Sequence, residues 1–387
     1  MSTLRVNTLQ NTSTTDGGIS INNAGHVTVD GVAMPSTGAL GSRNMVINGA
    51  MNITQRGTAS VTATGQYPVD RFVTSFSVTS AAISSEVQLE APAGFAKSLR
   101  YRMTTAASAG AAEVNNIQHK IEGANTRHLK WGTAQASNVT LSFWVRSSNA
   151  GTYCVSLRND VSETRRSYVA EYTIAADDTW ERITIPIDGD TGGTWLADSG
   201  LGINITWDLG SGSNFNGTAD TWLNNENRLN TSNQFDFAGT TDAEFYLTGV
   251  QLEVGDVATP FEMRSHGLEL SLCQRYWSQS YNLGTAVGST DYSGAIHCRV
   301  DQTTGVTNHF PNVRFPVVMR TIPTVTLYSP QTGTADRISD WGTGSSHSND
   351  GTVSSLTHVG SQGFGRLELS VVEGPAIIFH YTAAAEL

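Results

Sequence analysis

The sequence is poor in charge, in lysine and in cysteine. Only 15% of the 387 residues are charged, against about 25% in ordinary soluble domains, and the net charge is −11. The only lysines are Lys97, Lys120 and Lys130. Non-specific nucleic-acid binding needs a basic stripe that displaces counterions, so this composition argues against it. We expect a surface that is mostly uncharged and polar, which suits a protein that works outside cells.

Long hydrophobic runs and a secretory pattern are also missing. No stretch reaches about 18 consecutive apolar residues, so membrane insertion is not predicted. The N-terminus has no basic region followed by an apolar one, so it does not resemble a signal peptide. Cys154, Cys273 and Cys298 have unrelated spacings, which fit neither a disulfide framework nor a metal site. We therefore expect three small buried thiols and no cofactor.

What the sequence does contain is alternation with a period of two. In LSFWVRS (141–147) apolar residues occupy every second position, which places Trp144 on the opposite face. The same pattern recurs in TYCVSLRN (152–159), WERITIPI (180–187), GLGINITWDLG (200–210) and FYLTGVQLEVG (245–255). Many short alternating strands separated by turn residues predict an all-β fold, a β-sandwich or jelly roll.

The period changes once, in HGLELSLCQRYW (266–277). Leu268, Leu272 and Tyr276 recur there at every fourth position, which predicts one short amphipathic helix. Strand-like patterns return in the segments IHCRV, TVTLY, RLELSVV and AIIFHYTA. Residues 332–355 are so rich in polar residues and glycine that they predict a long loop.

These patterns divide the chain into four predicted parts. Residues 1–43 are short polar alternations that cannot bury a core alone, so we expect an extended N-terminal segment for anchoring and oligomerisation. A jelly-roll β-sandwich follows at 44–264 and a helical connector at 265–280. Residues 281–387 are predicted to form a distal β-sandwich domain.

Several separated motifs resemble bacteriophage tail-fibre and related virion fibre proteins. They are RNMVINGAMNITQRG (43–57), YPVDRF (67–72), GVQLEVGDVATPFE (249–262), ELSLCQRYW (269–277) and FHYTAAAEL (379–387). The middle domain is similar to the jelly rolls of carbohydrate-binding modules. The resemblance implies that residues 1–43 attach the fibre to other virion proteins, and it leaves tail, baseplate and head open as the place of attachment.

No motif for catalysis or for metal binding stands out. The sequence lacks a nucleophile elbow, a zinc-protease motif, a phosphate-binding loop and a dinucleotide fingerprint. Its nine histidines are scattered without ligand spacing. IDGDTGG (187–193) places Asp188 and Asp190 at calcium-loop spacing, but it lacks the remaining ligand positions, and a hairpin turn is the preferred interpretation.

A polysaccharide depolymerase would need two carboxylates held on one sugar-binding groove. The candidates are Asp177, Asp178, Asp208, Asp220 and Glu226. Any acidic β protein offers as many, and no repeat with the period of a β-helix, about 20–30 residues, is visible. We therefore predict that the chain is not an enzyme.

Sugar recognition requires aromatic faces beside hydrogen-bonding side chains. Trp195, Trp222 and Trp341 lie in polar, loop-like stretches, and Trp144 faces away from its apolar neighbours. These four are the predicted ligand-binding residues. The alternatives are that each loop ring anchors its loop, and that Trp144 packs beneath a loop or in a subunit interface. The other tryptophans are expected to be core residues: Trp131, Trp180, Trp207 and Trp277.

Arg56, Asp70 and Arg71, within the fibre-like motifs, are predicted to form a structural ion-pair or hydrogen-bond cluster. The whole chain is predicted to be a homotrimeric virion fibre protein that adsorbs to a host-surface polysaccharide, where three sites raise avidity by about 10²–10⁴. A purely structural or decorating fibre without a ligand and a depolymerase are the alternatives.

Overall fold

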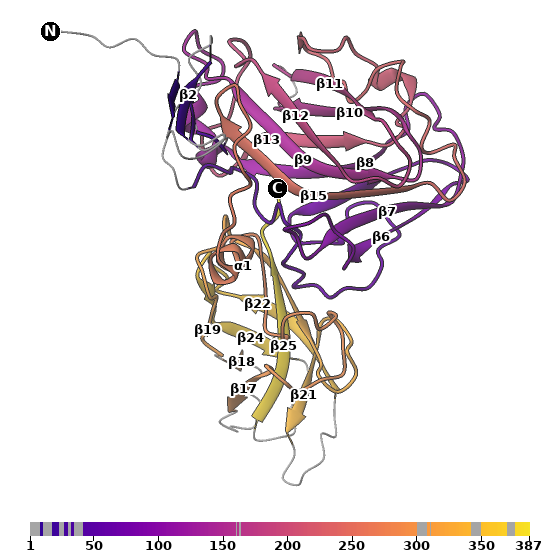
Figure 1. Cartoon of the computed structure of the whole chain (residues 1–387). Helices are drawn as coiled ribbons and strands as arrows, with labels where there is room; N and C mark the ends of the chain where they lie inside the picture. Colours follow the sequence, from indigo (N-terminus) through magenta and orange to yellow (C-terminus); the bar gives the residue numbers. More distant parts are fainter. Residues whose placement is uncertain are drawn as a thin grey trace, which may run out of the picture. The chain divides into compact units, whose positions relative to one another are not determined.

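The structure, a computed structural model, forms two compact units (Figure 1). It describes residues 8–10, 18–22, 27–29, 32–34, 42–159, 161, 164–299, 308–309, 311–341, 350–369 and 376–387. Unit 1 comprises Met1–Ala50, Thr62–Gly65 and Thr74–Arg264, and unit 2 comprises Met51–Val61, Gln66–Val73 and Ser265–Leu387. Each unit is therefore assembled from separate stretches of the chain. The four-part division made from the sequence stays a prediction.

Two antiparallel sheets build unit 1. The six-stranded sheet has the order β14 (Trp222–Asn224), β11 (Arg166–Ile174), β10 (Gly151–Arg158), β13 (Leu201–Asp208), β8 (Asn115–Glu122) and β5 (Phe72–Phe76). The five-stranded sheet has the order β12 (Glu181–Ile187), β9 (Val139–Ser147), β15 (Glu244–Val254), β7 (Ser98–Thr105) and β6 (Ala82–Gln88). The chain alternates between the sheets from β7 to β10 and again from β11 to β13. This crossing pattern is that of a jelly-roll β-sandwich, and it confirms the predicted fold class.

The core lies between these sheets, where the predicted alternation directs side chains inward. Val155 stands opposite Trp207 and Leu157 opposite Ile205 in the β10–β13 ladder, and all four are fully buried. Phe143 of the other sheet meets Trp207 edge to face, with ring centroids 5.8 Å apart. Burying one such side chain stabilises a fold by about 1.5–3 kcal/mol. The placement of Trp207 in the core is thus confirmed.

The N-terminal residues form a separate four-stranded meander. Its strands are β1 (Thr8–Gln10), β2 (Gly18–Ile21), β3 (Val27–Val29) and β4 (Val32–Ala33). Ile19 stands opposite Val29, and Ile21 opposite Val27, so these four apolar side chains share one face. Ile19 and Ile21 are 40% and 43% exposed. We call these four residues the meander's apolar face.

Unit 2 is arranged around one long strand, β25 (Ala376–Ala384), which pairs with four others. Its single described α-helix is α1 (His266–Gln274). The remaining strands are β16 (Trp277–Gln279), β17 (Ile296–Arg299), β18 (Asn308–His309), β19 (Val313–Arg314), β20 (Thr324–Tyr328), β21 (Arg337–Trp341), β22 (Asp350–Thr357), β23 (Gly363–Phe364) and β24 (Arg366–Leu369). Phe364 of the small β19–β23 ladder contacts Phe379 and Tyr381 of β25, which gives unit 2 a core of its own.

Two predictions about unit 2 are wrong in part. The helix ends at Gln274 instead of Trp277, because Trp277 starts β16 and pairs with Ala384. The polar stretch 332–355 is not one loop, because it contains β21 and the start of β22. Ser339 pairs with Ile378 of β25, and this ladder satisfies backbone groups whatever the polarity of the side chains.

The predicted cluster of Arg56, Asp70 and Arg71 is confirmed in part within unit 2. Asp70 accepts hydrogen bonds from the backbone N–H and the side-chain amide of Gln55, at 3.3 and 2.7 Å. Arg56 and Arg71 both form ion pairs with Glu386. Arg71 also lies 3.5 Å from the ring centroid of Tyr276. Arg56 lies over two rings, those of Tyr67 and Trp277, at 4.0 and 4.2 Å. We use the name arginine cluster for Arg56, Arg71 and Glu386 with these rings.

The predicted burial of the cysteines and of the core tryptophans is confirmed only in part. Cys154 and Cys273 are buried free thiols, and Cys298 is half-buried. Trp131 is buried, as expected of a core residue, whereas Trp180 and Trp277 are only half-buried. No helix within the described ranges is long and apolar enough to cross a membrane.

Candidate functional site

Two of the four predicted tryptophans meet in unit 1. Trp195 lies in the connection from β12 to β13, and Trp222 opens β14. Both pack edge to face on Trp131, with ring centroids 4.7 and 5.3 Å apart. They also pack on each other, at 5.5 Å. Trp131, Trp195 and Trp222, which we call the tryptophan cluster, thus come together from two connections of the jelly roll and from its edge strand β14.

Hydrogen bonds fix the orientation of each ring in the cluster. Trp131 is only 7% exposed, and its indole N–H donates to the Ser137 carbonyl oxygen at 2.8 Å. The indole N–H of Trp222 donates to the Asp188 carbonyl oxygen at 2.8 Å. Trp195 and Trp222 are half-buried, so part of each ring stays accessible. Trp131 is therefore the buried base of the cluster, and the rings of Trp195 and Trp222 form the outer part of the cluster.

A buried ion pair supports the outer rings. Arg166 donates to both carboxylate oxygens of Asp190, from Nε at 2.7 Å and from a terminal nitrogen at 2.5 Å. Asp190 is only 1% exposed, and it also accepts a hydrogen bond from the indole N–H of Trp195 at 3.0 Å. A bidentate arginine–carboxylate pair is geometrically specific. It ties β11 to the loop that carries Trp195.

The segment IDGDTGG is the turn that places Asp190 beside Arg166. It was predicted to be a hairpin turn, which is wrong, because β12 and β13 belong to different sheets. Gly193 has φ +71°, and a Cβ atom there would lie 2.4 Å from Cγ of Arg166. Glycine is therefore required both for the left-handed backbone and for the close approach to the arginine.

A cavity of about 50 Å³ lies beside the rings of Trp131 and Trp195. Arg127 and Lys130 line it, and both are exposed. Pockets that enclose small ligands usually measure about 300–1,000 Å³, so this one cannot enclose a sugar ring. A sugar at this place would lie across the outer rings, with the two basic side chains at its edge.

Trp144 and Trp341 do not join the cluster. Trp144 is half-buried on the outer face of β9, where a Cβ atom on Gly249 would lie 2.9 Å from its ring and 2.7 Å from that of Phe95. Its ring therefore packs against the β15 backbone beside Phe95. Trp341 is the last residue of β21 in unit 2, so its placement in a loop is wrong. Its side chain lies outside the described residues.

The carboxylates considered for a depolymerase serve separate contacts. Asp178 pairs with Arg146, and Glu226 with Arg228. The others accept hydrogen bonds from the Ala150 backbone (Asp177), from the Tyr168 hydroxyl (Asp220) and from the connection after β13 (Asp208). No group of three or more histidine, cysteine or acidic residues suited to a metal ion occurs in the part of the chain that the structure describes.

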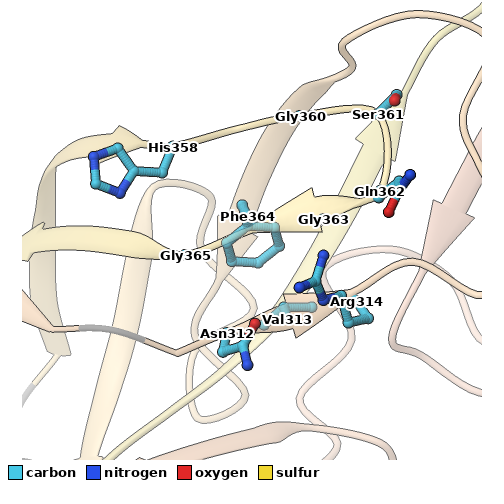
Figure 2. Close-up of a pocket in the computed structure, with 10 residues that line it drawn as sticks. All are labelled: Asn312, Val313, Arg314, His358, Gly360, Ser361, Gln362, Gly363, Phe364 and Gly365. Atoms are coloured by element: carbon cyan, nitrogen blue, oxygen red, sulfur yellow. The ribbon is translucent and has the colours of Figure 1, made fainter.

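A larger cavity, of about 410 Å³, lies in unit 2 (Figure 2). Residues 312–314 line one side, and His358 with residues 360–365 lines the other. The exposed polar side chains include Arg314, His358 and Gln362. Phe364 is only 3% exposed, so little of its ring is available for stacking on a ligand. Sequence reasoning missed this cavity, although the glycine-rich stretch GSQGFG (360–365) was a signal of a tight turn.

Comparisons with known proteins give likenesses among solved structures only. No family model matches the sequence, and no curated protein does. The family 11 carbohydrate-binding module of a Clostridium thermocellum cellulase is 12% identical, with a TM-score of 0.27, over 51% of this chain and 96% of that one. The xylan-binding CBM22-2 domain of Paenibacillus barcinonensis is 14% identical, with a TM-score of 0.28, over 50% of this chain and 99% of that one.

A phage protein is also among these likenesses. The enzymatically active domain of tailspike protein 4 of bacteriophage CBA120 is 12% identical, with a TM-score of 0.29. The match covers 55% of this chain and 21% of that one. The description of unit 1 as a jelly roll rests on its own strand order.

Proposed function

We propose that this chain is a virion fibre protein that adsorbs to a host-surface polysaccharide, and that unit 1 binds this glycan at the tryptophan cluster. The observation that carries the proposal is the convergence of Trp195 and Trp222 on the buried Trp131. Both outer residues are sugar-stacking candidates that the sequence predicts, and their rings are in contact with each other. The motifs that resemble phage fibre proteins support the virion assignment.

The cluster is suited to binding because its rings are held before a ligand arrives. The indole N–H groups of Trp195 and Trp222 are already bonded to Asp190 and to the Asp188 backbone. Immobilising a flexible side chain costs about 0.5–1.5 kcal/mol on binding, and rings fixed in advance avoid most of that cost. The apolar C–H face of a sugar would stack on the outer rings, while Arg127 and Lys130 would hydrogen-bond its hydroxyls.

Alanine variants of the three cluster residues test the site. Trp195→Ala and Trp222→Ala should each weaken binding by about 1–3 kcal/mol, by analogy with stacking on bases, which is about tenfold or more in Kd. Trp131→Ala should instead lower the free energy of unfolding by about 3–5 kcal/mol, because it removes the buried ring and leaves a cavity beneath the other two. Isothermal titration with purified host polysaccharide measures the first effect, and calorimetric melting measures the second.

A matched control and two remaining candidates complete this test. Trp180→Ala removes a half-buried ring that packs on Tyr246, and it should leave binding unchanged. If the two outer variants melt early with normal affinity, their rings are loop anchors and the proposed site fails. Loss of affinity in Trp144→Ala or Trp341→Ala alone would move the site to the outer face of β9 or to unit 2.

We propose further that the fibre is a homotrimer joined in part through the meander's apolar face. Strands this short cannot form a stable sheet alone, and Ile19 and Ile21 remain exposed on it. A second and third copy of the same face would cover them, while residues 1–43 would also contact other virion proteins. Light scattering should give three chains, and Ile19→Asp with Ile21→Asp should weaken the assembly. A stable monomer at micromolar concentration would remove the avidity argument.

Binding without cleavage is the last part of the proposal. Incubation with host polysaccharide should retain its chain length, because the candidate carboxylates among the described residues serve separate contacts instead of a shared sugar surface. Release of reducing ends would instead favour a depolymerase, with Glu226 as the first residue to test. Asp208 is fully buried, which argues against its contact with a polysaccharide. Failure to bind any host glycan would favour the decorating fibre.

A further inference from the structure

The cavity of unit 2 has the size of a ligand pocket and an unusual charge for this chain. Its volume of about 410 Å³ falls within the range of about 300–1,000 Å³ that is usual for such pockets. The ten described residues that line it include no acid, although the net charge of the chain is −11. Arg314 and His358 are the basic residues of this lining, and both side chains are exposed. The cavity is therefore a basic place in an acidic protein.

Both basic side chains are available to a ligand. Neither Arg314 nor His358 has a side-chain hydrogen bond or an ion pair with any residue that the structure describes. Other arginines of unit 2 are engaged: Arg71 pairs with the carboxylate of Glu386, and Arg320 donates to the backbone carbonyl oxygen of Glu386 at 2.7 Å. A free guanidinium group can bind a carboxylate through two parallel hydrogen bonds.

The rest of the lining suits the hydroxyl groups of a sugar. Its uncharged polar side chains offer both donors and acceptors, and they are Asn312, Ser361 and Gln362. In Figure 2, Arg314 lies between His358 and Gln362. Of the described lining residues, Phe364 alone carries a benzene ring, and it is too buried to stack on a sugar. Because stacking is not available, binding must depend on hydrogen bonds and charge, which favours an anionic sugar over a neutral one.

Two glycines of the lining are not required by packing or by backbone angle. A Cβ atom added at Gly360 would meet one atom, at 4.0 Å, and at Gly365 it would meet none within 4 Å. Neither residue has a positive φ. Gly363 differs, because its Cβ atom would lie 2.1 Å from the carbonyl oxygen of Val313. Glycine also serves where the backbone approaches a ligand closely, and this use accounts for Gly360 and Gly365.

The backbone at His358 points in the same direction. Its φ is +55°, in the left-handed region that costs free energy in a residue with a Cβ atom. Glycine at this position would avoid the cost. Residues held in such conformations cluster at ligand-binding sites, where the side chain has a use other than folding.

We propose that this cavity binds a sugar that carries a carboxylate group, such as a uronic acid. The carboxylate pairs with the guanidinium group of Arg314, and the hydroxyl groups of the sugar bond to His358, Asn312 and Gln362. All of these residues belong to unit 2. The proposal therefore does not depend on glycan binding at the tryptophan cluster.

Titration calorimetry of the full chain with sodium glucuronate tests the site. Glucuronate should bind at least about tenfold tighter than glucose, because only glucuronate offers a carboxylate to Arg314. Arg314→Gln should remove this difference. Arg127→Gln is the matched control, since Arg127 is an exposed arginine beside the tryptophan cluster, and the preference should persist in it. Loss of the preference in Arg127→Gln alone would place the acidic sugar at the cluster and overturn the proposal.

A second variant separates ligand binding from folding. His358→Gly removes the imidazole and relieves the left-handed backbone, so the affinity for glucuronate should fall by about threefold or more. The Tm should stay unchanged, because the relief offsets the greater freedom of glycine in the unfolded chain. A lower Tm with unchanged affinity would mean that His358 serves the fold, and it would overturn the site. Equal affinity of the wild type for glucose and glucuronate, or tighter binding of inorganic phosphate than of glucuronate, would overturn it as well.

Discussion

The two units use the same types of residue in different ways. Unit 1 pairs Arg166 with Asp190 beside Trp222, and unit 2 pairs Arg71 with Glu386 over Tyr276. In both, a buried arginine is held by a carboxylate and faces aromatic rings. In unit 1 the carboxylate also orients Trp195, a half-buried ring next to a cavity. In unit 2 it neutralises a second arginine, Arg56.

This difference shows which property distinguishes a candidate site from a structural anchor. Residue types do not, since arginine, carboxylate and aromatic rings occur in both places. What differs is the second group that the carboxylate contacts. Besides its arginine, Asp190 bonds to a ring that solvent can still reach, whereas Glu386 pairs with a second arginine, Arg56. Four predictions test this difference between the two units, in order of decreasing expected effect.

Neutralising either carboxylate should have the largest effect. Glu386→Gln and Asp190→Asn should each lower the free energy of unfolding of their unit by about 3–5 kcal/mol, because each leaves a buried arginine without its charged partner. Only Asp190→Asn should also weaken glycan binding, since it loosens Trp195. Calorimetric melting and titration of both variants check this. An equal loss of glycan affinity in the two variants would show that the two carboxylates do not differ in this way.

The acid beside the arginine cluster should make unit 2 depend on pH. Burial raises the pKa of Asp70 to about 6, so the folded state holds its proton more tightly than the unfolded chain does. Its contribution to stability is complete below about pH 4 and is lost as the pH rises through about 6, by about 3 kcal/mol in all.

Asp70→Asn should remove this pH dependence. The variant cannot ionise, so its Tm should change less than that of the wild type between about pH 4 and pH 7. Melting curves over that range are the measurement. A wild-type Tm that rises across the same window would contradict the prediction. Asp242→Asn, which changes an exposed acid in unit 1, is the control.

Substituting the glycine of the Asp190 turn should have an intermediate effect. Gly193→Ala forces alanine to φ +71° and brings its Cβ within 2.4 Å of Arg166, so we expect a loss of about 2–3 kcal/mol. Gly65→Ala is matched in angle, at φ +75°, but has no atom within 4 Å of the added Cβ, so about 1 kcal/mol is expected. Chemical denaturation of both variants separates strain from crowding. A similar loss in both would mean that the close approach to Arg166 is unimportant.

The smallest effect should come from an exposed ion pair. Arg102 contacts Asp242 at 2.7 Å, with the two side chains 38% and 63% exposed. Solvent screens such a pair, so Arg102→Ala should change stability by about 1 kcal/mol or less. Denaturation at low and high salt checks this. A loss as large as that of Asp190→Asn would show that burial does not decide the strength of these pairs.

The sequence predicted the strands of unit 1 well and those of unit 2 less well. Alternation in 141–147 and 245–255 marks β9 and β15, because each strand has one face in the core. Residues 337–341 gave no such signal. They form β21 because β25 offers backbone partners, and a ladder of backbone hydrogen bonds does not depend on side-chain polarity.

The candidate site was predictable only in part. Trp195 and Trp222 stood out as apolar rings among polar neighbours, and the structure places them together. The base of the cluster was missed as a site residue, because Trp131 resembled any core tryptophan. Its role depends on rings that are more than 60 residues away in the chain, and no local pattern records such a distance.

By itself the sequence determined the all-β class, the faces of the principal strands and the scarcity of charge at the surface. These follow from local alternation and from composition, which each segment carries with it. Only the tertiary structure decided which loops meet, which carboxylates are buried and which rings stay accessible. Those features depend on how strands from distant parts of the chain pair and cross between sheets, and the same residues in another strand order would make different neighbours.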